Sequence, residues 1–471
     1  MLFNSIPFLI FFPIVTLLFY AIPHKYRWVL LLAASCFFYM FFVPQYILIL
    51  LITILIDYTA GIYIEKTEGK RKKSFLILSI VSTCLVLVIF KYLGFFHQNM
   101  ISLSHYFGFS YPDRALKIIL PIGLSFHTFQ SLSYVIEVYR SKQKAEKHFG
   151  VYSLYVMFYP QLVTGPIERP QNLLRQLREE KAFELSNLIR GLRLILFGLF
   201  IKMVIADNLA VYVDQVYENP LIYNSFSILT ALLFYSFQIY CDFFGYSTIA
   251  LGCALSMGYC ITDNFKTPYL AKNINEFWHR WHISLSTWFR DYVYFPLGGN
   301  RVKLPRWIFN IGVVFVLSGF WHGANWTFIF WGAAYAFIYL IEHAFQKNIK
   351  FNFSSNRLIS TALHGFSVIK NFVLITLVWV FFRAVNLSQI KQIFSSIYHN
   401  FHVEDTFLVE NKIWLFLSLF ILIDILIRKS RFDTWCGNRS FIVRWLIYAV
   451  LIFSILVFSS VNNFPFIYFQ F

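Results

Sequence analysis

The sequence predicts an all-α, polytopic membrane protein, and three observations support this class. Of the 471 residues, 58% are hydrophobic and only 13% are charged, whereas soluble domains carry about 25% charged residues. Many windows reach the roughly 18 to 20 consecutive apolar residues that a helix needs to cross a bilayer. The apolar runs are continuous and do not alternate, which argues against a β-barrel. We therefore expect about ten to twelve transmembrane helices in a single membrane-embedded domain over residues 1–471.

The net charge of +17 agrees with membrane topology better than with nucleic-acid binding. Basic residues collect in the cytoplasmic loops of membrane proteins, and no basic domain lies outside the apolar runs. We expect a lipid bilayer as the surroundings of this chain and no nucleic-acid partner.

Charge alternates along the first five apolar runs and indicates their orientation. Basic residues follow the first run at 24–27 and the third run at 65–73, and they follow the fifth run (117–139) at 140–147. The intervening loop 97–113 contains no Lys or Arg. Because basic loops face the cytoplasm, the N-terminus is expected on the extracytoplasmic side.

The later segments continue this alternation. Residues 168–193 are basic and polar and predict an amphipathic segment on the cytoplasmic side. Residues 206–220 carry only acidic charge and are expected outside, while an acidic stretch at 387–411 precedes a basic one at 428–431.

Residues 263–306 interrupt the apolar pattern, because charged and aromatic residues interleave there at high density. With helical spacing, residues 276–291 predict an interfacial or re-entrant helix, which is tolerated in a membrane only where protein or water surrounds it. Its apolar face would contain Trp278, Trp281, Trp288 and Phe289, and its polar face Glu276, Arg280, Arg290 and Asp291. Polar density of this kind usually marks a site. A purely structural aromatic belt with snorkelling arginines remains the alternative.

Two histidines of this stretch, His279 and His282, stand three residues apart on one helical face. A metal pair would need a third ligand, and no carboxylate or cysteine close by completes the set. We expect no bound metal or cofactor, with His282 facing a cavity and His279 facing the membrane interface.

The segment SGFWHGANWTFIFWG (318–332) places the single histidine His322 among Trp and Phe residues. From composition alone, a core histidine hydrogen-bonded between helices is the favoured interpretation. An ionisable group within a transmembrane segment is also a hypothesis for a functional site.

The two histidine segments together resemble a known family. NEFWHRWHISLSTWFRDYVYFPLGGNR (275–301), followed by 318–332, resembles the membrane-bound O-acyltransferase superfamily, in particular its bacterial alginate O-acetyltransferase branch. The resemblance is strongest over 1–385, with its motif core at 263–332. Three further segments are similar to that branch: NFKTPYLAKNINEFW (264–278), LPIGLSFHTFQSLSY (120–134) and YPQLVTGPIERP (159–170).

The resemblance implies acyl transfer from a thioester, typically acetyl-CoA, to a hydroxyl group, with His322 as the catalytic residue and His282 as a second polar position. Burial among Trp and Phe favours the neutral imidazole, which can accept the hydroxyl proton. His282, Asn325 or Trp N–H groups are candidate donors to the oxyanion. Arginines of the motif core are candidates for binding the donor phosphates, with snorkelling to lipid headgroups as the alternative. The donor- or substrate-binding residues that we expect are Arg280, Arg290, Asn325, Trp321 and Trp281.

The resemblance further implies a multi-pass enzyme of the bacterial inner membrane. Acetyl groups would pass from a cytoplasmic thioester toward an extracytoplasmic polysaccharide such as alginate, with a periplasmic or surface acetyltransferase as partner protein. Alternatives are D-alanyl transfer to teichoic acid from a carrier protein, peptidoglycan O-acetylation, and a non-enzymatic polysaccharide transporter. His127, within 120–134, is a candidate for lining the cavity.

Overall fold

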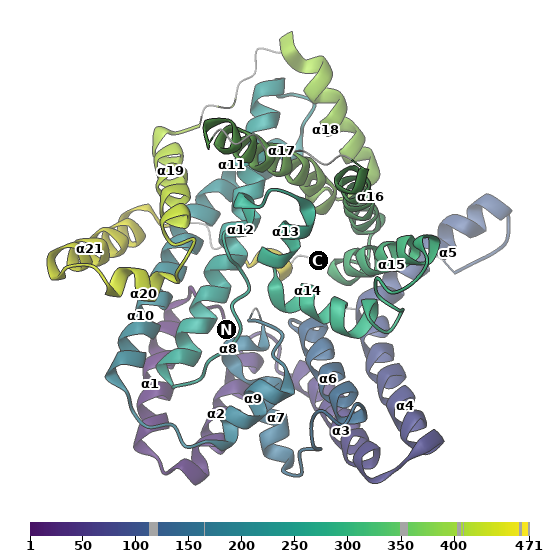
Figure 1. Cartoon of the computed structure of the whole chain (residues 1–471), viewed down its shortest axis with the longest axis vertical. Coiled ribbons are helices and arrows are strands. Elements are labelled where there is room, and N and C mark those ends of the chain that lie inside the picture. The colour runs from purple at the N-terminus through teal and green to yellow at the C-terminus, as the bar shows by residue number, and fades with distance from the viewer. Residues whose placement is uncertain are drawn as a thin grey trace. The chain divides into compact units, whose positions relative to one another are not determined.

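All secondary structure that the computed structural model describes is helical, which confirms the predicted class (Figure 1). The described residues are 1–112, 121–163, 165–348, 357–402, 407, 409–460 and 464–469. One or more residues of several segments discussed above lie outside the described residues, namely in 97–113, 117–139, 120–134, 159–170 and 387–411.

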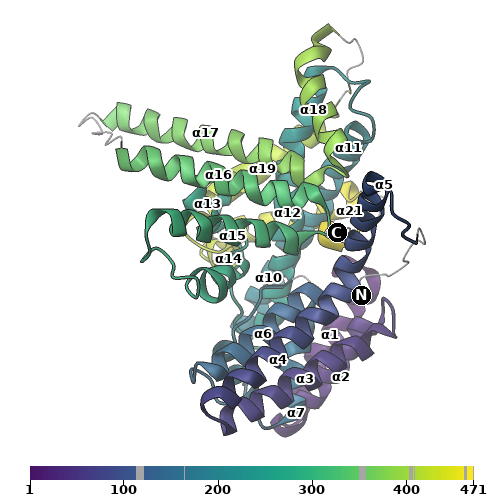
Figure 2. The ribbon, with the colours of Figure 1, turned by 90° about the vertical axis from the view of Figure 1, so that its right-hand side faces the viewer.

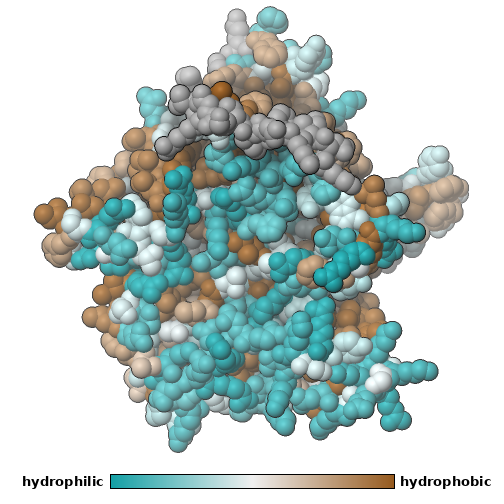
Figure 3. All heavy atoms as spheres, viewed as in Figure 1, coloured by the Kyte–Doolittle hydropathy of each residue, from teal (hydrophilic) through white to brown (hydrophobic). Residues whose placement is uncertain are grey.

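Eight helical segments of the described chain are long and apolar enough to cross a membrane. They are Tyr46–Lys66, Gly69–Phe107, Leu185–Glu218, Ser225–Ser256, Leu304–His322, Trp326–Gln346, Ile359–Arg383 and Phe441–Phe458. The last segment exposes most of its hydrophobic side chains, at the left edge of Figure 3, as a lipid-facing helix would. The predicted count of ten to twelve spans stays a prediction, because length and composition do not decide whether shorter apolar helices such as α1 (Ile6–Ala21) also cross.

The chain divides into two compact units, and the predicted single domain stays a prediction. The first unit comprises Met1–Ile195 and Ile249–Thr262. Its helices are α1 (Ile6–Ala21), α2 (His24–Met40), α3 (Tyr46–Lys66), α4 (Gly69–Leu87), η1 (Val88–Tyr92), α5 (Leu93–Phe107), α6 (Leu124–Tyr139), α7 (Phe149–Met157), α8 (Tyr159–Leu162), α9 (Pro170–Arg178) and most of α10 (Leu185–Phe200).

Close packing joins α3, α4 and α6, which lie side by side in Figures 1 and 2. A Cβ at Gly61 of α3 would stand 2.6 Å from the Tyr134 ring of α6, so only glycine fits there. Between α3 and α4, the buried Asp57 carboxylate accepts hydrogen bonds from Ser79 and Thr83 at 2.5 and 2.9 Å. These contacts satisfy a polar group that the membrane interior could not solvate.

Helix α9 shows the amphipathic pattern expected within 168–193. Leu173, Leu174 and Leu177 are buried, whereas Arg175 and Arg178 are exposed. Its apolar face therefore packs against the protein.

The second unit comprises Leu196–Thr248 and Asp263–Phe471. Long helix α12 (Ser225–Ser256) lies mostly in this unit. The other elements are η2 (Ile201–Ala206), α11 (Asp207–Glu218), η3 (Pro268–Leu270), α13 (Ile274–Arg280), α14 (Ile283–Phe289), η4 (Arg290–Tyr294), α15 (Leu304–His322), α16 (Trp326–Asn348), α17 (Arg357–Arg383), α18 (Leu387–His399), η5 (Asn400–His402), α19 (Asn411–Leu426), α20 (Phe432–Gly437), α21 (Phe441–Phe458) and η6 (Ile467–Phe469).

Residues 276–291 of the polar stretch do not form one helix, which corrects the prediction. Helix α13 ends at Arg280 and α14 begins at Ile283, because His282 adopts a left-handed conformation with φ 43°. His279 and His282 consequently do not share a helical face. His279 is exposed and His282 is buried. That His282 faces a cavity and His279 the membrane interface stays a prediction.

Glycines bring α15 and α16 into backbone contact (Figure 2). A Cβ at Gly319 would lie 2.1 Å from the carbonyl oxygen of Phe328, and one at Gly332 would lie 2.3 Å from that of Phe315. Small residues at helix interfaces permit this approach in membranes. The FWHGANW segment thus forms the tight junction between two spans and holds His322 at the end of α15.

We expect Gly319→Ala to lower the thermal stability of the protein, because its methyl group would force α15 away from α16. Gly312→Ala on the same helix is the matched control, since a Cβ there meets nothing within 4 Å. We expect Gly312→Ala to raise the free energy of unfolding by about 1 kcal/mol over the unmodified protein, because alanine has a higher helix propensity than glycine. Thermal unfolding in detergent measures both variants, and equal shifts in the same direction would contradict the proposed packing.

Candidate active site

His322 is the last residue of α15 and is almost entirely buried, with 4% of its surface exposed. Aromatic rings surround its imidazole, including those of four described residues. The centroid distances are 4.9 Å to Trp321, 5.1 Å to Trp331, 5.1 Å to Phe382 and 5.5 Å to Tyr468. Aromatic rings therefore enclose the imidazole within the protein.

His282 lies at the break between α13 and α14 and has no exposed surface. Its Nδ1 lies 3.4 Å from Asn264 Oδ1, which also accepts from the Ser284 backbone N–H at 3.2 Å. Because a carbonyl oxygen only accepts, we assign the proton to Nδ1, which leaves a lone pair on Nε2. Burial lowers the pKa of His282 to about 3, so this imidazole is neutral at physiological pH.

Shared aromatic neighbours bring the two histidines into one cluster. The Trp321 ring is 4.9 Å from His322 and 6.3 Å from His282. Phe243 of α12 is 4.7 Å from His282 and 4.8 Å from Tyr468, which contacts His322. Three of the expected site residues, His322, His282 and Trp321, therefore belong to the same buried cluster.

Tyr468 is a site residue that the sequence interpretation missed. It belongs to the described segment 464–469, which runs into the core of the second unit, with Phe466 and Ile467 buried. Among the four rings around His322, only that of Tyr468 bears a hydroxyl group. The segment therefore brings a phenol to the candidate base.

A buried ion cluster holds this segment in place. The Lys202 Nζ lies 2.6 Å from both Asp207 Oδ1 and Asp242 Oδ1, and the Lys202 side chain is only 1% exposed. The other oxygen of Asp242 accepts a hydrogen bond from the Ile467 backbone N–H at 2.7 Å. Asp242 thus connects the cluster both to Ile467, next to Tyr468, and to its own neighbour Phe243.

A narrow polar cavity borders this cluster. Its volume is about 10 Å³, which is enough for one water molecule. Phe464 and Pro465 form part of its wall, and Arg383 pairs there with Asp214 at 2.7 Å. This ion cluster could have been found from the sequence, because Lys202 and Asp242 are isolated charged residues within apolar spans. Such residues are rare in membranes and usually functional.

The two arginines expected to bind donor phosphates are engaged with carboxylates. Arg280 pairs with Glu276 at 2.5 Å and also contacts Thr267. Arg290 pairs with Asp291 at 2.9 Å. Each positive charge is thus partly compensated within the polar stretch itself.

Asn325 and Trp281 contact neighbouring residues, and their expected role in binding the donor or substrate stays a prediction. The Asn325 amide donates to the carbonyl oxygen of Val385 at 2.8 Å, and its oxygen accepts from the Thr327 N–H at 3.1 Å, at the start of α16. Trp281 is buried against Phe277 and Trp379, with centroids 5.5 and 5.0 Å away.

His127 belongs to the first unit, where it is buried and hydrogen-bonds to Thr53 of α3.

The fold and the site define a multi-pass helical membrane protein with two buried imidazoles inside its core. Residues 124–385 match the model of the membrane-bound O-acyltransferase family, which covers more than half of the chain. The chain belongs to this family and is an O-acyltransferase, so the transporter interpretation is set aside.

Two named relatives cover most of the chain, and a third covers about half of it. It is 35% identical over 387 residues to the peptidoglycan O-acetyltransferase of Helicobacter pylori, covering 76% of this chain and 71% of the relative. It is 35% identical over 392 residues to the probable alginate O-acetylase AlgI of Pseudomonas aeruginosa, covering 82% and 73%. The teichoic acid D-alanyltransferase of Bacillus subtilis is 32% identical over 246 residues, covering 49% and 61%.

We expect His282 to make stability depend on pH. The unfolded imidazole binds a proton below about pH 6.5, whereas the folded one, with a pKa of about 3, does not. Between these values the unfolded state binds more protons, so stability falls as pH falls, by about 2 kcal/mol from pH 7 to pH 5. Thermal unfolding at both pH values should show a smaller pH effect in His282→Gln than in the unmodified protein. The same pH dependence in both proteins would contradict this assignment.

We expect Lys202→Met to destabilise the protein by about 3–5 kcal/mol, because it leaves two buried carboxylates without their cation. Lys370→Met is the matched control, since Lys370 pairs with Glu342 at a partly exposed site and its loss should cost less than about 1 kcal/mol. Unfolding in detergent measures both variants. Equal losses of stability in the two variants would contradict the prediction that the buried cluster contributes more than an exposed ion pair.

Proposed function

We propose that the protein transfers an acetyl group from a thioester donor, acetyl-CoA, toward hydroxyl groups of an extracytoplasmic polysaccharide, with His322 as the general base. The observation that supports this most directly is the burial of His322 in a cluster that also contains His282 and the Tyr468 phenol. A neutral, buried imidazole can take the proton of an acceptor hydroxyl group, as a general base must.

In the proposed reaction, the acceptor oxygen forms a C–O bond to the acyl carbon while the C–S bond of the thioester breaks. His322 takes the proton of the attacking hydroxyl and returns it to the departing thiolate sulfur. The imidazole is neutral again at the end, so the reaction consumes no external acid or base. A positioned base of this kind typically contributes about 10²- to 10⁴-fold in rate.

The negative charge on the tetrahedral intermediate needs hydrogen-bond donors. The Tyr468 hydroxyl and the indole N–H of Trp321 belong to side chains that contact His322. In low-dielectric surroundings such donors stabilise an oxyanion more strongly than water would. The assigned tautomer of His282 points its proton toward Asn264, so we propose that His282 orders the cluster and does not donate to the oxyanion.

The names of the relatives suggest the acceptor class. The relatives over most of the chain are named for acetylation of alginate or peptidoglycan, and both of these are hydroxyl-bearing polymers outside the cytoplasm. We propose alginate-like polysaccharide as the first acceptor to test and peptidoglycan as the second. The proposed location is the bacterial inner membrane with the N-terminus outside, together with a periplasmic or surface acetyltransferase that completes the transfer.

D-alanyl transfer to teichoic acid is a second candidate, because the teichoic acid D-alanyltransferase of Bacillus subtilis matches about half of this chain. That reaction would take its acyl group from a carrier protein. Acetyl transfer by the purified protein with acetyl-CoA alone would favour the first candidate.

We expect His322→Ala to fold but to lose at least about 10²-fold in acyl transfer, because no base remains to take the hydroxyl proton. The measurement is transfer from radiolabelled acetyl-CoA by the protein in vesicles. His279→Ala is the matched control, since His279 is exposed and, among the described residues, bonds only to Asn275 of its own helix. Tyr468→Phe removes only the phenol oxygen and should also lower the rate. Near-normal transfer by His322→Ala would remove His322 from the mechanism.

A further inference from the structure

We propose that a basic cavity in the first unit binds the phosphate group of an organic anion. The cavity lies among the start of α2, the start of α7, the end of α9 and Tyr259, and its volume is about 200 Å³. This is below the roughly 300–1,000 Å³ of pockets for drug-sized ligands. It suits a phosphate with part of its ester.

Three of the ten residues that line this cavity are permanent cations. Lys25, Arg27 and Arg178 are permanent cations, His148 adds an imidazole, and no acidic side chain is found among the described residues that line it. Because like charges gathered around one cavity repel each other, a bound anion would relieve their repulsion.

Two of these cations have no carboxylate partner among the described residues. Arg27 donates to the carbonyl oxygens of Ile22 and Lys181 at 3.3 and 2.5 Å. These bonds orient the guanidinium and leave its charge uncompensated. Lys25 is exposed, and its ammonium lies over the ring of Tyr26 at 4.8 Å. Both contacts are compatible with an additional anionic ligand.

The third cation, Arg178, presents a free edge. It uses Nε and one terminal nitrogen for the Glu146 carboxylate, and its other terminal nitrogen remains for a second acceptor. His148 Nδ1 accepts from the Val151 N–H at 3.2 Å, so the ring proton is on Nε2 and can be donated. Arginine and imidazole N–H groups are characteristic partners of phosphate oxygens.

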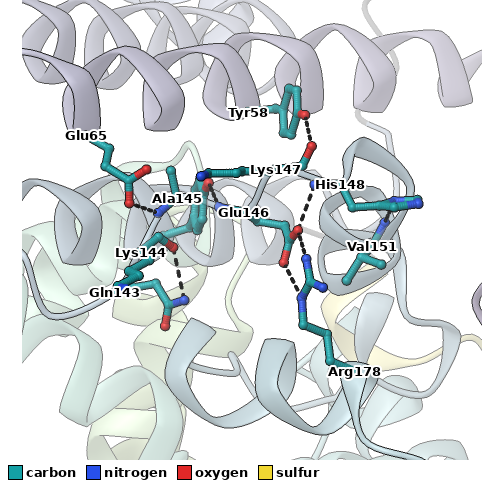
Figure 4. Close-up of polar contacts among 11 residues, drawn as sticks. Tyr58, Glu65, Gln143, Lys144, Ala145, Glu146, Lys147, His148, Val151 and Arg178 are labelled. Carbon is teal, nitrogen blue, oxygen red and sulfur yellow. Dashed lines mark hydrogen bonds and ion pairs between the residues drawn. The ribbon is translucent and has the colours of Figure 1, made fainter.

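Hydrogen bonds and an ion pair hold the wall that contains His148, as Figure 4 shows. Glu146 accepts from the His148 N–H at 2.7 Å while it pairs with Arg178. The Tyr58 hydroxyl donates to the carbonyl oxygen of Lys147 at 2.6 Å. Because these bonds already order the segment, ligand binding would cost little conformational entropy.

An aromatic wall closes the cavity beside these cations. The Trp28 ring contacts His148 edge-on at 4.7 Å. Only glycine fits at position 150, because a Cβ there would lie 2.1 Å from Trp28. The Trp28 indole therefore packs directly against α7, and it lines the cavity together with His148 and Arg178.

The phosphate has two possible sources on the side where the sequence places the basic loops. One is the nucleotide part of a CoA thioester, an assignment that rests on the proposed function. The other is the headgroup of an anionic phospholipid, which basic side chains near a membrane attract. The same phosphate-binding chemistry serves both sources.

The test uses the full-length protein and the charge reversal Lys25→Glu. Lys73→Glu is the matched control, since it makes the same change at an exposed lysine of the basic segment 65–73, outside the cavity. One arm measures binding of CoA in phosphatidylcholine nanodiscs, with inorganic phosphate as competitor. The other arm measures, by native mass spectrometry, retention of phosphatidylglycerol from mixed phosphatidylglycerol and phosphatidylcholine vesicles.

We expect Lys25→Glu to weaken one of these interactions by roughly tenfold, as reversal of a nearby exposed charge should, and Lys73→Glu to leave both near normal. Weaker CoA binding identifies the thioester nucleotide as the ligand, whereas lower retention of phosphatidylglycerol with unchanged CoA binding identifies the headgroup. If Lys25→Glu matches Lys73→Glu in both arms, the proposal is overturned. Neither arm requires acyl transfer, so His322→Ala should bind normally even where the proposed reaction fails.

Discussion

The candidate site depends on the ion cluster of Lys202 with Asp207 and Asp242. A lysine at this depth is tolerated only because two carboxylates compensate its charge. The second carboxylate oxygen of Asp242, which does not contact Lys202, accepts a hydrogen bond from the Ile467 backbone N–H. The cluster therefore places Tyr468, the next residue, against His322. Buried charge in this fold determines where a phenol stands relative to an imidazole.

The helices that carry the site pack closely, because glycines stand where their backbones meet and large aromatic rings fill the space beside them. Gly319 and Gly332 let α15 and α16 touch, so His322 can stand at their junction among Trp321 and Trp331. Lipid tails are as apolar as leucine side chains, so close van der Waals packing has to supply the association between the helices. A rigid junction follows, and a base held there loses little freedom in the transition state.

Sequence reasoning located the histidines but not the whole cluster around them. The motif segments place His322 and His282 in specific apolar surroundings, and local pattern is sufficient for that. Tyr468 comes from a segment 146 positions after His322 in the sequence, and a contact of that range has no local periodicity. The break before α14 was also missed, because a left-handed φ at a residue other than glycine, such as His282, has no local sequence signal, and its neighbour Asn264 lies 18 positions earlier. Likewise, the sequence did not predict that Arg280 pairs with Glu276 or that Asn325 bonds to Val385.

This chain contains two kinds of basic residue, which differ in whether a carboxylate lies beside them. Arg280 and Arg290 stand beside carboxylates four residues and one residue away, and their charges serve local structure. Lys25 and Arg27 have no such partner among the described residues, although the helix that they begin would favour acidic groups there. Cations at the positive end of a helix are unfavourable unless an anion joins them. Function in a basic membrane protein is therefore better sought where positive charge is left uncompensated than where basic residues are most frequent.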